Sequence, residues 1–207
     1  MVLEGSTSAL PGGRRTRAAS PIHSFRAKGL EETLGLSLPS KIDMDFLLNS
    51  YLKSVHWFMM VFHESSFRAR YNELLSSSHL TSSQRPFSIL LLLILGMGAR
   101  YADEEMIKAS CPELDAEGFE KAALAKVESC LIELFDEPEL ESVQICVLLA
   151  SFYLYNGRPN LGFVILGSGI KCAQAISLHR ETASPTITDI NREERRRAWW
   201  ALYVYDR

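Results

Sequence analysis

The chain has 207 residues and a mass of 23.3 kDa; 47% of its residues are hydrophobic and 23% are charged. These values are ordinary for a soluble globular protein, and the length suits one domain with or without a tail. Because 22 Lys and Arg residues stand against 25 Asp and Glu residues, the net charge of −3 argues against a histone-like or ribosomal type of chain.

Residues 1–40 are rich in Ser, Gly, Pro and Arg. Within residues 1–30, five basic side chains stand against the single acid Glu4, a local balance of 5 − 1 = +4. Such a segment buries too little apolar surface to offset its ordering entropy, so we expect a disordered tail and a domain over residues 41–207.

A small basic cluster lies in this tail, at Arg14, Arg15 and Arg17. We interpret it first as a solvated run, because short basic runs are common. A weak nuclear-import or phosphate-contacting cluster is the second interpretation, and a mitochondrial presequence is the third.

From residue 41 onward, apolar residues recur at steps of three and four, the period of an amphipathic helix. The pattern predicts a first helix from near Asp43, with one apolar face continuing to Phe62. A shorter helix is predicted from near Ser65, with Phe67 and Tyr71 on its inner face.

The third predicted helix is apolar on all sides. Ser82 or Ser83 is its expected cap, and Pro86 suits its first turn because the missing N–H has no partner there. The apolar stretch from Phe87 to Ala99 is shorter than the roughly 20 residues of a membrane span, so we expect a buried core helix.

Four further helices are predicted. The fourth is capped by Asp115 and ends at Pro138, and the fifth covers about residues 140–156. Gly157 then suits a left-handed helix end, and Asn160 is the expected cap of the sixth helix, whose inner face includes Phe163. Three glycines inside the sixth helix indicate the close approach of a neighbouring helix: Gly162, Gly167 and Gly169.

The last predicted helix has a capping box formed by Asn191 and Glu194. Trp199, Leu202 and Tyr203 are expected to share its inner face, and an exposed apolar patch is expected near the end of the chain. No run has the period of a strand, so the predicted class is all-α, with about seven helices packed antiparallel.

The cysteines give no metal-binding pattern. Four are present, without a CxxC pair or a histidine at ligand spacing: Cys111, Cys130, Cys146 and Cys172. We therefore predict reduced thiols, core thiols at Cys146 and Cys172, and no zinc site.

No catalytic motif is complete. His63-Glu64 resembles the start of HExxH, but Phe67 occupies the second ligand position. His56 and His63 lack a third ligand and are interpreted as core or capping residues. The paired glycines around Met97 and Ser168 complete neither a phosphate loop nor a nucleophile elbow, so the chain is not expected to be an enzyme.

Arginines and tryptophans stand together at residues 195–200, a mixture found in nucleic-acid sites. On a helix, successive residues are separated by about 100°, so the arginines and Trp199 point in different directions. We therefore favour a solvated charged face on an amphipathic helix over a nucleic-acid site.

The segment from Arg195 to Arg207 (RRRAWWALYVYDR) resembles the signature helix of the fungal-specific transcription factor domain, the middle regulatory region of the fungal zinc-cluster transcription factors. Other stretches match in the same order: 48–56 with 62–68, 96–101, 141–154, 157–159 and 169–180. The residues that carry the family signature are His56, His63, Phe67, Gly98, Arg100, Tyr101, His179, Arg180, Arg196, Arg197, Trp199, Trp200, Tyr203, Asp206 and Arg207.

The resemblance implies a nuclear, DNA-linked regulator of transcription, one that controls metabolic or secondary-metabolite genes in many filamentous fungi. It also implies an all-helical domain that transmits regulation, with the transcription machinery or a full-length DNA-binding factor as partner. A homodimer or heterodimer is an expected assembly, and no membrane is involved. The alternative is a helical scaffold, or a truncated remnant of such a factor, that works only through protein partners. The alternative location is the cytoplasm.

Two departures from the family pattern shape this expectation. The family's DNA-reading module is an N-terminal six-cysteine zinc cluster, whereas residues 1–110 contain no cysteine. No zinc ligand can be assigned, no cofactor is expected in this chain, and DNA is expected to be contacted only indirectly or weakly. The family domain also continues beyond its Tyr-x-x-Asp-Arg stretch, so we expect residues 41–207 to be the N-terminal part of a larger domain.

Overall fold

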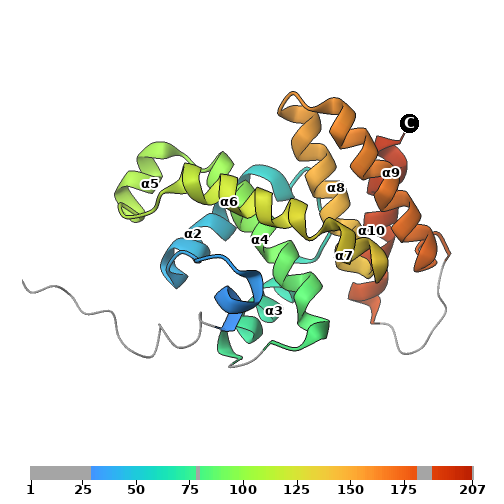
Figure 1. The fold of residues 1–207 in the computed structure, drawn as a ribbon, viewed down its shortest axis with the longest axis horizontal. Helices are drawn as coiled ribbons and strands as arrows, with labels where there is room; N and C mark the ends of the chain where they lie inside the picture. The colour runs from blue at the N-terminus through green and yellow to red at the C-terminus, as the bar shows by residue number, and fades with distance from the viewer. Residues whose placement is uncertain (1–28, 78–79, 181–187, 207) are drawn as a thin grey trace, which may run out of the picture.

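Helices make up all the regular secondary structure of the part of the chain described by the computed structural model, residues 29–77, 80–180 and 188–206 (Figure 1). The longer helices are α2 (Lys41–Tyr51), α3 (Glu64–Ser76), α4 (Arg85–Tyr101), α5 (Glu104–Ser110), α6 (Ala116–Ser129), α8 (Leu140–Tyr155), α9 (Pro159–Ala175) and α10 (Asp189–Tyr205). Shorter turns are η1 (Leu52–His56), η2 (Ser82–Gln84) and α7 (Leu131–Asp136). The predicted all-α class is confirmed.

Helix α4 is the centre of the fold. Every residue from Phe87 to Ala99 is buried, because α2, α6 and α8 all pack against this helix (Figure 1). By length and composition Ser82–Tyr101 could cross a membrane, but 72% of the apolar window lies buried inside the fold. The prediction of a buried core helix is confirmed.

The ordered domain begins before residue 41. Residues 29–34 form a short helix, and Leu30 and Leu34 are buried in the main core. Residues 29–40 therefore pack with the domain. The rest of the predicted tail lies outside the described residues.

The first predicted helix is shorter than expected. After α2 the chain forms the π-helical turn η1, which ends at His56. A π turn holds more residues than an α turn, so it shifts the register of the side chains. As a result Phe58 is 54% exposed, and Phe62 reaches the core from a loop. The prediction of one continuous apolar face to Phe62 is wrong.

Helix α6 begins as predicted, with the Asp115 carboxylate accepting the Gly118 N–H at 2.9 Å. The expected single helix is interrupted at Cys130, after which α7 follows. Helix α5 was not predicted. None of its seven residues is buried, so it has no apolar period to reveal it.

The turn between α8 and α9 contains Gly157 at φ +78°, which confirms the predicted left-handed helix end. Helix α9 starts at Pro159 with Arg158 as its cap, so the assignment of Asn160 as the cap is wrong. The predicted inward position of Phe163 is also wrong, because its side chain is 58% exposed.

Two of the three glycines in α9 lie at close helix contacts. A Cβ at Gly169 would lie 2.7 Å from Cys146 Cβ and 3.1 Å from Leu202 Cδ2, so this glycine lets α8 and α10 approach α9. A Cβ at Gly162 would lie 3.0 Å from the Ala150 carbonyl oxygen of α8. Gly167 faces open space, so the expected contact is absent there.

Helix α10 starts earlier than predicted. Thr188 is its cap, with the side-chain oxygen accepting the Asn191 N–H at 3.2 Å. Asn191 therefore lies in the first turn, and the predicted capping box is wrong. Leu202 is fully buried and Trp199 is half-buried, but Tyr203 is exposed, which corrects its predicted place on the inner face.

The closest helix contact of the core predicts a large effect of one methyl group. A Cβ at Gly98 of α4 would lie 2.1 Å from the Leu47 carbonyl oxygen of α2, a backbone atom that cannot rotate away. We expect Gly98→Ala to lower the free energy of unfolding by about 1–3 kcal/mol, measured by urea denaturation.

Gly167→Ala is the matched control, because no atom lies within 4 Å of its added Cβ. In a helix interior this change should raise the free energy of unfolding by up to about 1 kcal/mol. Equal effects of the two substitutions would contradict the proposed contact between α2 and α4.

Candidate protein-interaction surface

A row of neighbouring aromatic rings passes from the end of η1 through the first turn of α3 to α4. The His56 ring centroid is 4.4 Å from that of Phe62, and Phe62 is 4.5 Å from Phe67. Phe67 continues the row to Phe87 of α4 at 5.1 Å. The predicted site residues His56 and Phe67 therefore belong to one aromatic row that connects η1 to the central helix.

The Tyr51 ring also stacks on Phe62, with centroids 6.0 Å apart. Two buried polar atoms, Tyr51 Oη and His56 Nδ1, have no hydrogen-bond partner among the described residues. Burial raises the pKa of Tyr51. Burial is also the largest influence on His56 and lowers its pKa; Arg197 and His63 lower it further, whereas Glu64 raises it. The imidazole is therefore favoured in its neutral form.

Helix α10 is attached to the start of α3 by one carboxylate. Glu194 Oε1 accepts the backbone N–H of His63, the N-cap residue of α3, at 2.8 Å. A negative group at the N-terminus of a helix also interacts favourably with the helix dipole. Burial raises the pKa of Glu194, although its bond to His63 lowers it.

A second set of contacts joins α10 to the loop after η1. The Tyr205 hydroxyl donates to Met59 Sδ at 3.4 Å and is also hydrogen-bonded to Tyr155 of α8. Arg197 Nε donates to Glu193 at 2.7 Å, and its Nη1 lies 3.9 Å from Met60 Sδ. The loop, α8 and α10 thus meet along one edge.

Exposed aromatic side chains gather at this edge. Trp57 is 68% exposed and Tyr155 is 67% exposed. Phe58 lies between them, with ring centroids 5.8 Å from Trp57 and 6.4 Å from Tyr155. With the exposed Met60 they form a surface of four residues that we call the aromatic surface: Trp57, Phe58, Met60 and Tyr155.

The aromatic surface has the composition of a protein interface. Tryptophan, tyrosine, phenylalanine and methionine are enriched at interface cores, and contiguous exposed apolar patches mark interaction sites. A second exposed group lies on α10, where the Trp200 and Tyr203 ring centroids are 5.4 Å apart and Val204 is also exposed. The exposed patch was predicted on the face of Trp199, Leu202 and Tyr203, but Leu202 is buried and Trp199 is half-buried, so only Tyr203 of that face is exposed.

The remaining signature residues lie in separate groups. The His179 ring centroid is 5.8 Å from that of Trp199, and Arg180 Nε donates to His179 Nε2 at 3.2 Å. Arg100 Nη2 and the Tyr101 hydroxyl both lie near the Asn156 side chain at the end of α8, at 3.3 and 3.5 Å.

The structure therefore does not bring the signature residues into one site. Gly98 lies in the core, Arg196 pairs with Glu193 on the surface, and Asp206 is the exposed C-cap of α10. Four predicted residues lie outside the described residues: Arg207, Arg14, Arg15 and Arg17. The functional roles of all these residues stay predictions.

The cysteines are all buried and unpaired, as expected of core thiols. Burial raises the pKa of Cys111 to about 11 and also raises the pKa of Cys146 and Cys172. Across residues 29–77, 80–180 and 188–206, no three His, Cys, Asp or Glu side chains gather as metal ligands. The expectation of no cofactor stays a prediction.

Sequence reasoning placed Phe58 on a helix face and gave no role to Trp57 or Tyr155. The apolar spacing continues past residue 56 and predicts Phe58 in the core. The helix ends at the π turn, so Phe58 is exposed instead. Adjacent aromatic residues at 57–58, directly after a histidine and before two methionines, were the one available signal.

The chain belongs to the family described as the fungal specific transcription factor domain, whose model matches residues 48–207. It is similar to an uncharacterized transcriptional regulatory protein of Schizosaccharomyces pombe, with 26% identity over 100% of this chain and 26% of that protein. It is also similar to the thiamine repressible genes regulatory protein thi1 of the same yeast, with 25% identity over 82% of this chain and 22% of the relative.

The transcription factor lepE of Aspergillus flavus is 27% identical over 90% of this chain and 22% of its own length. The chain thus spans about a quarter of the length of these relatives. No solved structure matches it. These comparisons confirm the family resemblance on which the functional expectation depends.

The Glu194 contact predicts different effects of two substitutions. Glu194→Ala leaves the His63 N–H without its acceptor, so we expect the free energy of unfolding to fall by about 1–3 kcal/mol. Glu194→Gln keeps an acceptor oxygen and removes the buried charge, so it should stay close to the wild-type value. Urea denaturation measures both, and equal losses would contradict the role assigned to this hydrogen bond.

The lowered pKa of His56 predicts that the stability of the fold depends on pH. Because its pKa is lowered below 6.5 in the folded state, its contribution is complete above pH 6.5 and is lost as the pH falls through the lowered value. We expect thermal unfolding between pH 7 and about pH 5 to be less pH-dependent in His56→Phe than in the wild type.

Among the other shifted carboxyl groups, Glu117, Glu133 and Glu193 have pKa values lowered by hydrogen bonds to basic side chains, so they act in the same direction as His56. Three others act in the opposite direction. Burial raises the pKa of Glu120, Glu139 and Glu194 above 4.5, so they stabilise the folded state at lower pH. They are unchanged in His56→Phe, so the difference between the two profiles isolates His56. Parallel profiles would contradict the assignment.

Proposed function

We propose that this chain is the regulatory domain of a transcriptional regulator and acts by binding other proteins. Membership of the fungal specific transcription factor domain family, together with relatives named as transcriptional regulators, supports the class of function. The aromatic surface is the observation that supports the mode of action, because its four side chains are exposed and its three aromatic rings lie side by side.

The proposed partner is a component of the transcription machinery or a DNA-bound factor. Contact with DNA by these 207 residues is proposed to be indirect, because their four cysteines do not form the CxxC pairs of a zinc cluster. The proposed location is the nucleus. One relative is named as a regulator of thiamine repressible genes, so regulation of metabolic genes is part of the proposal.

The charges around α10 fit a structural role better than a nucleic-acid site. Arg196 and Arg197 both pair with Glu193, and Arg195 Nη2 donates to the Ile176 carbonyl oxygen at 3.1 Å. These arginines are therefore engaged within the domain. The interpretation of the cluster as part of an amphipathic helix is favoured.

A double substitution in the full-length gene tests the proposal. We expect Trp57→Ala with Phe58→Ala to weaken partner binding by about tenfold or more, because aromatic side chains dominate interface energetics. Transcript levels of the regulated genes and promoter occupancy by chromatin immunoprecipitation should fall together. Since both side chains are exposed, the free energy of unfolding should change by no more than about 0.5 kcal/mol each.

Ile132→Ala is the matched control. Ile132 is an exposed large apolar residue on α7, away from the aromatic surface in the chain. It should leave transcript levels and occupancy unchanged. A tagged protein that is evenly cytosolic, with no transcript change on gene deletion, would overturn the proposed function; a normal response to the double variant would overturn the role of the aromatic surface.

A further inference from the structure

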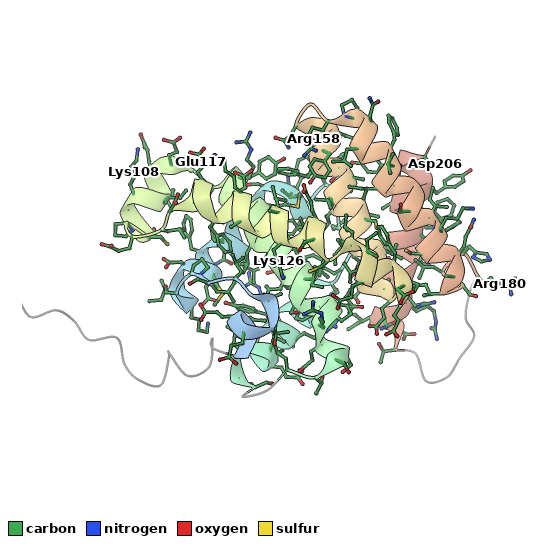
Figure 2. The ribbon with its side chains drawn as sticks, in the orientation of Figure 1. Lys108, Glu117, Lys126, Arg158, Arg180 and Asp206 are labelled. Atoms are coloured by element: carbon green, nitrogen blue, oxygen red, sulfur yellow. The ribbon has the colours of Figure 1, made fainter. Side chains whose placement is uncertain are left out.

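A cleft lies between α4, α6 and α8, apart from the signature helix. Its volume is about 470 Å³, within the usual range of small-molecule sites. The walls come from the C-terminal ends of α4 and α8 and from one side of α6. Figure 2 labels Glu117 and Arg158, which lie on the same upper edge of the molecule, at α6 and at the turn after α8.

The cleft contains two pairs of opposite charge that are not closed by a hydrogen bond. Arg100 Nε lies 3.9 Å from Glu120 Oε1, and Arg158 Nη1 lies 3.9 Å from Glu128 Oε1. A charge-assisted hydrogen bond between such groups is normally about 2.7–2.9 Å long. Both pairs therefore keep capacity to bind polar groups of a ligand.

Glu120 is the clearest case. Its side chain is only 14% exposed, and its carboxylate accepts no hydrogen bond from the described residues. Burial raises its pKa, although Arg100 and Lys121 lower it. Its oxygens are not among the fully buried side-chain atoms that lack a partner, so they are open to the cleft and can accept a hydrogen bond from a ligand.

The two arginines are held in place but retain donors. Arg100 Nη2 donates to Asn156 Oδ1 at 3.3 Å, which leaves the rest of its guanidinium available. The Arg158 guanidinium lies over the Tyr153 ring at 4.8 Å and donates no hydrogen bond within the described residues. Stacking fixes its orientation, so less freedom is lost when it binds an anion.

The remaining charges of the cleft are already satisfied. Lys121 Nζ donates to Glu117 at 2.6 Å, and the Tyr153 hydroxyl donates to Glu128. Phe152 and Leu124 supply an apolar part of the lining. The unmet groups are thus one carboxylate and two guanidinium groups beside an apolar wall.

We propose that this cleft binds a small zwitterionic molecule, of the α-amino-acid type with an apolar side chain. A ligand of one charge would be attracted by one member of the Arg100–Glu120 pair and repelled by the other. A ligand with an ammonium and a carboxylate on neighbouring atoms interacts favourably with both members. Its apolar side chain then lies along Phe152 and Leu124.

Binding of L-phenylalanine and L-leucine to the 207-residue chain tests this site. We expect saturable chemical-shift changes in the amide resonances of residues 117–128 and 152–158 at ligand concentrations up to about 10 mM. N-acetyl-L-phenylalanine lacks the ammonium group and phenethylamine lacks the carboxylate, so each should bind about tenfold or more weakly than phenylalanine.

Variants assign the binding to the named groups. Glu120→Gln and Arg100→Gln should each raise the dissociation constant about tenfold or more, whereas Lys171→Ala, which removes an exposed cation on α9, should leave it unchanged. Thermal unfolding of each variant reports whether it is folded.

Saturable binding of both amino acids, weakened in the analogues and in the cleft variants, would support the proposed site. Absence of saturable shifts with either amino acid, equal binding of the N-acetyl compound, or unchanged affinity in folded Glu120→Gln would overturn the proposal. The inference does not depend on the proposed function, because it is measured as binding by the chain alone.

Discussion

The complete burial of residues 87–99 of α4 is the constraint on which the rest of the structure depends. A helix that is apolar on all sides must be enclosed on all sides, and α2, α6 and α8 enclose it. Helices α2 and α4 make a close backbone contact, because Gly98 has no side chain and lets the Leu47 backbone approach α4. Helices α2 and α6 then need only one apolar face, whereas α8 is itself buried from Glu141 to Tyr153 because α9 and α10 also pack against it.

Helix α10 joins this body through a small set of specific contacts. Glu194 binds the start of α3, Leu202 packs against Gly169, and Tyr205 contacts Met59. These contacts fix the loop after η1 beside the ends of α8 and α10, and so they fix the aromatic surface. A regulatory domain that acts through protein contacts needs such a surface held in one conformation, because ordering it on binding would cost affinity.

The end of α8 contributes to both candidate sites. Tyr155 belongs to the aromatic surface, whereas Tyr153, Asn156 and Arg158 line the cleft. Successive residues of a helix point in directions about 100° apart, so one helix end can supply side chains to two surfaces. The two sites have different chemistry: the first is apolar and aromatic, and the second combines an apolar wall with unpaired charge.

The sequence by itself determined the all-α class, the central place of α4, the caps at Asp115 and Gly157 and the family, because helical period, capping residues and ordered motifs are local signals. It could not determine where α2 ends, since the apolar spacing continues through the π turn, nor could it find α5, which buries nothing. The aromatic surface and the cleft were decided only by the tertiary structure. Their residues come from segments as far apart as Phe58 and Tyr155, or Arg100 and Arg158, and only packing around α4 brings such segments together.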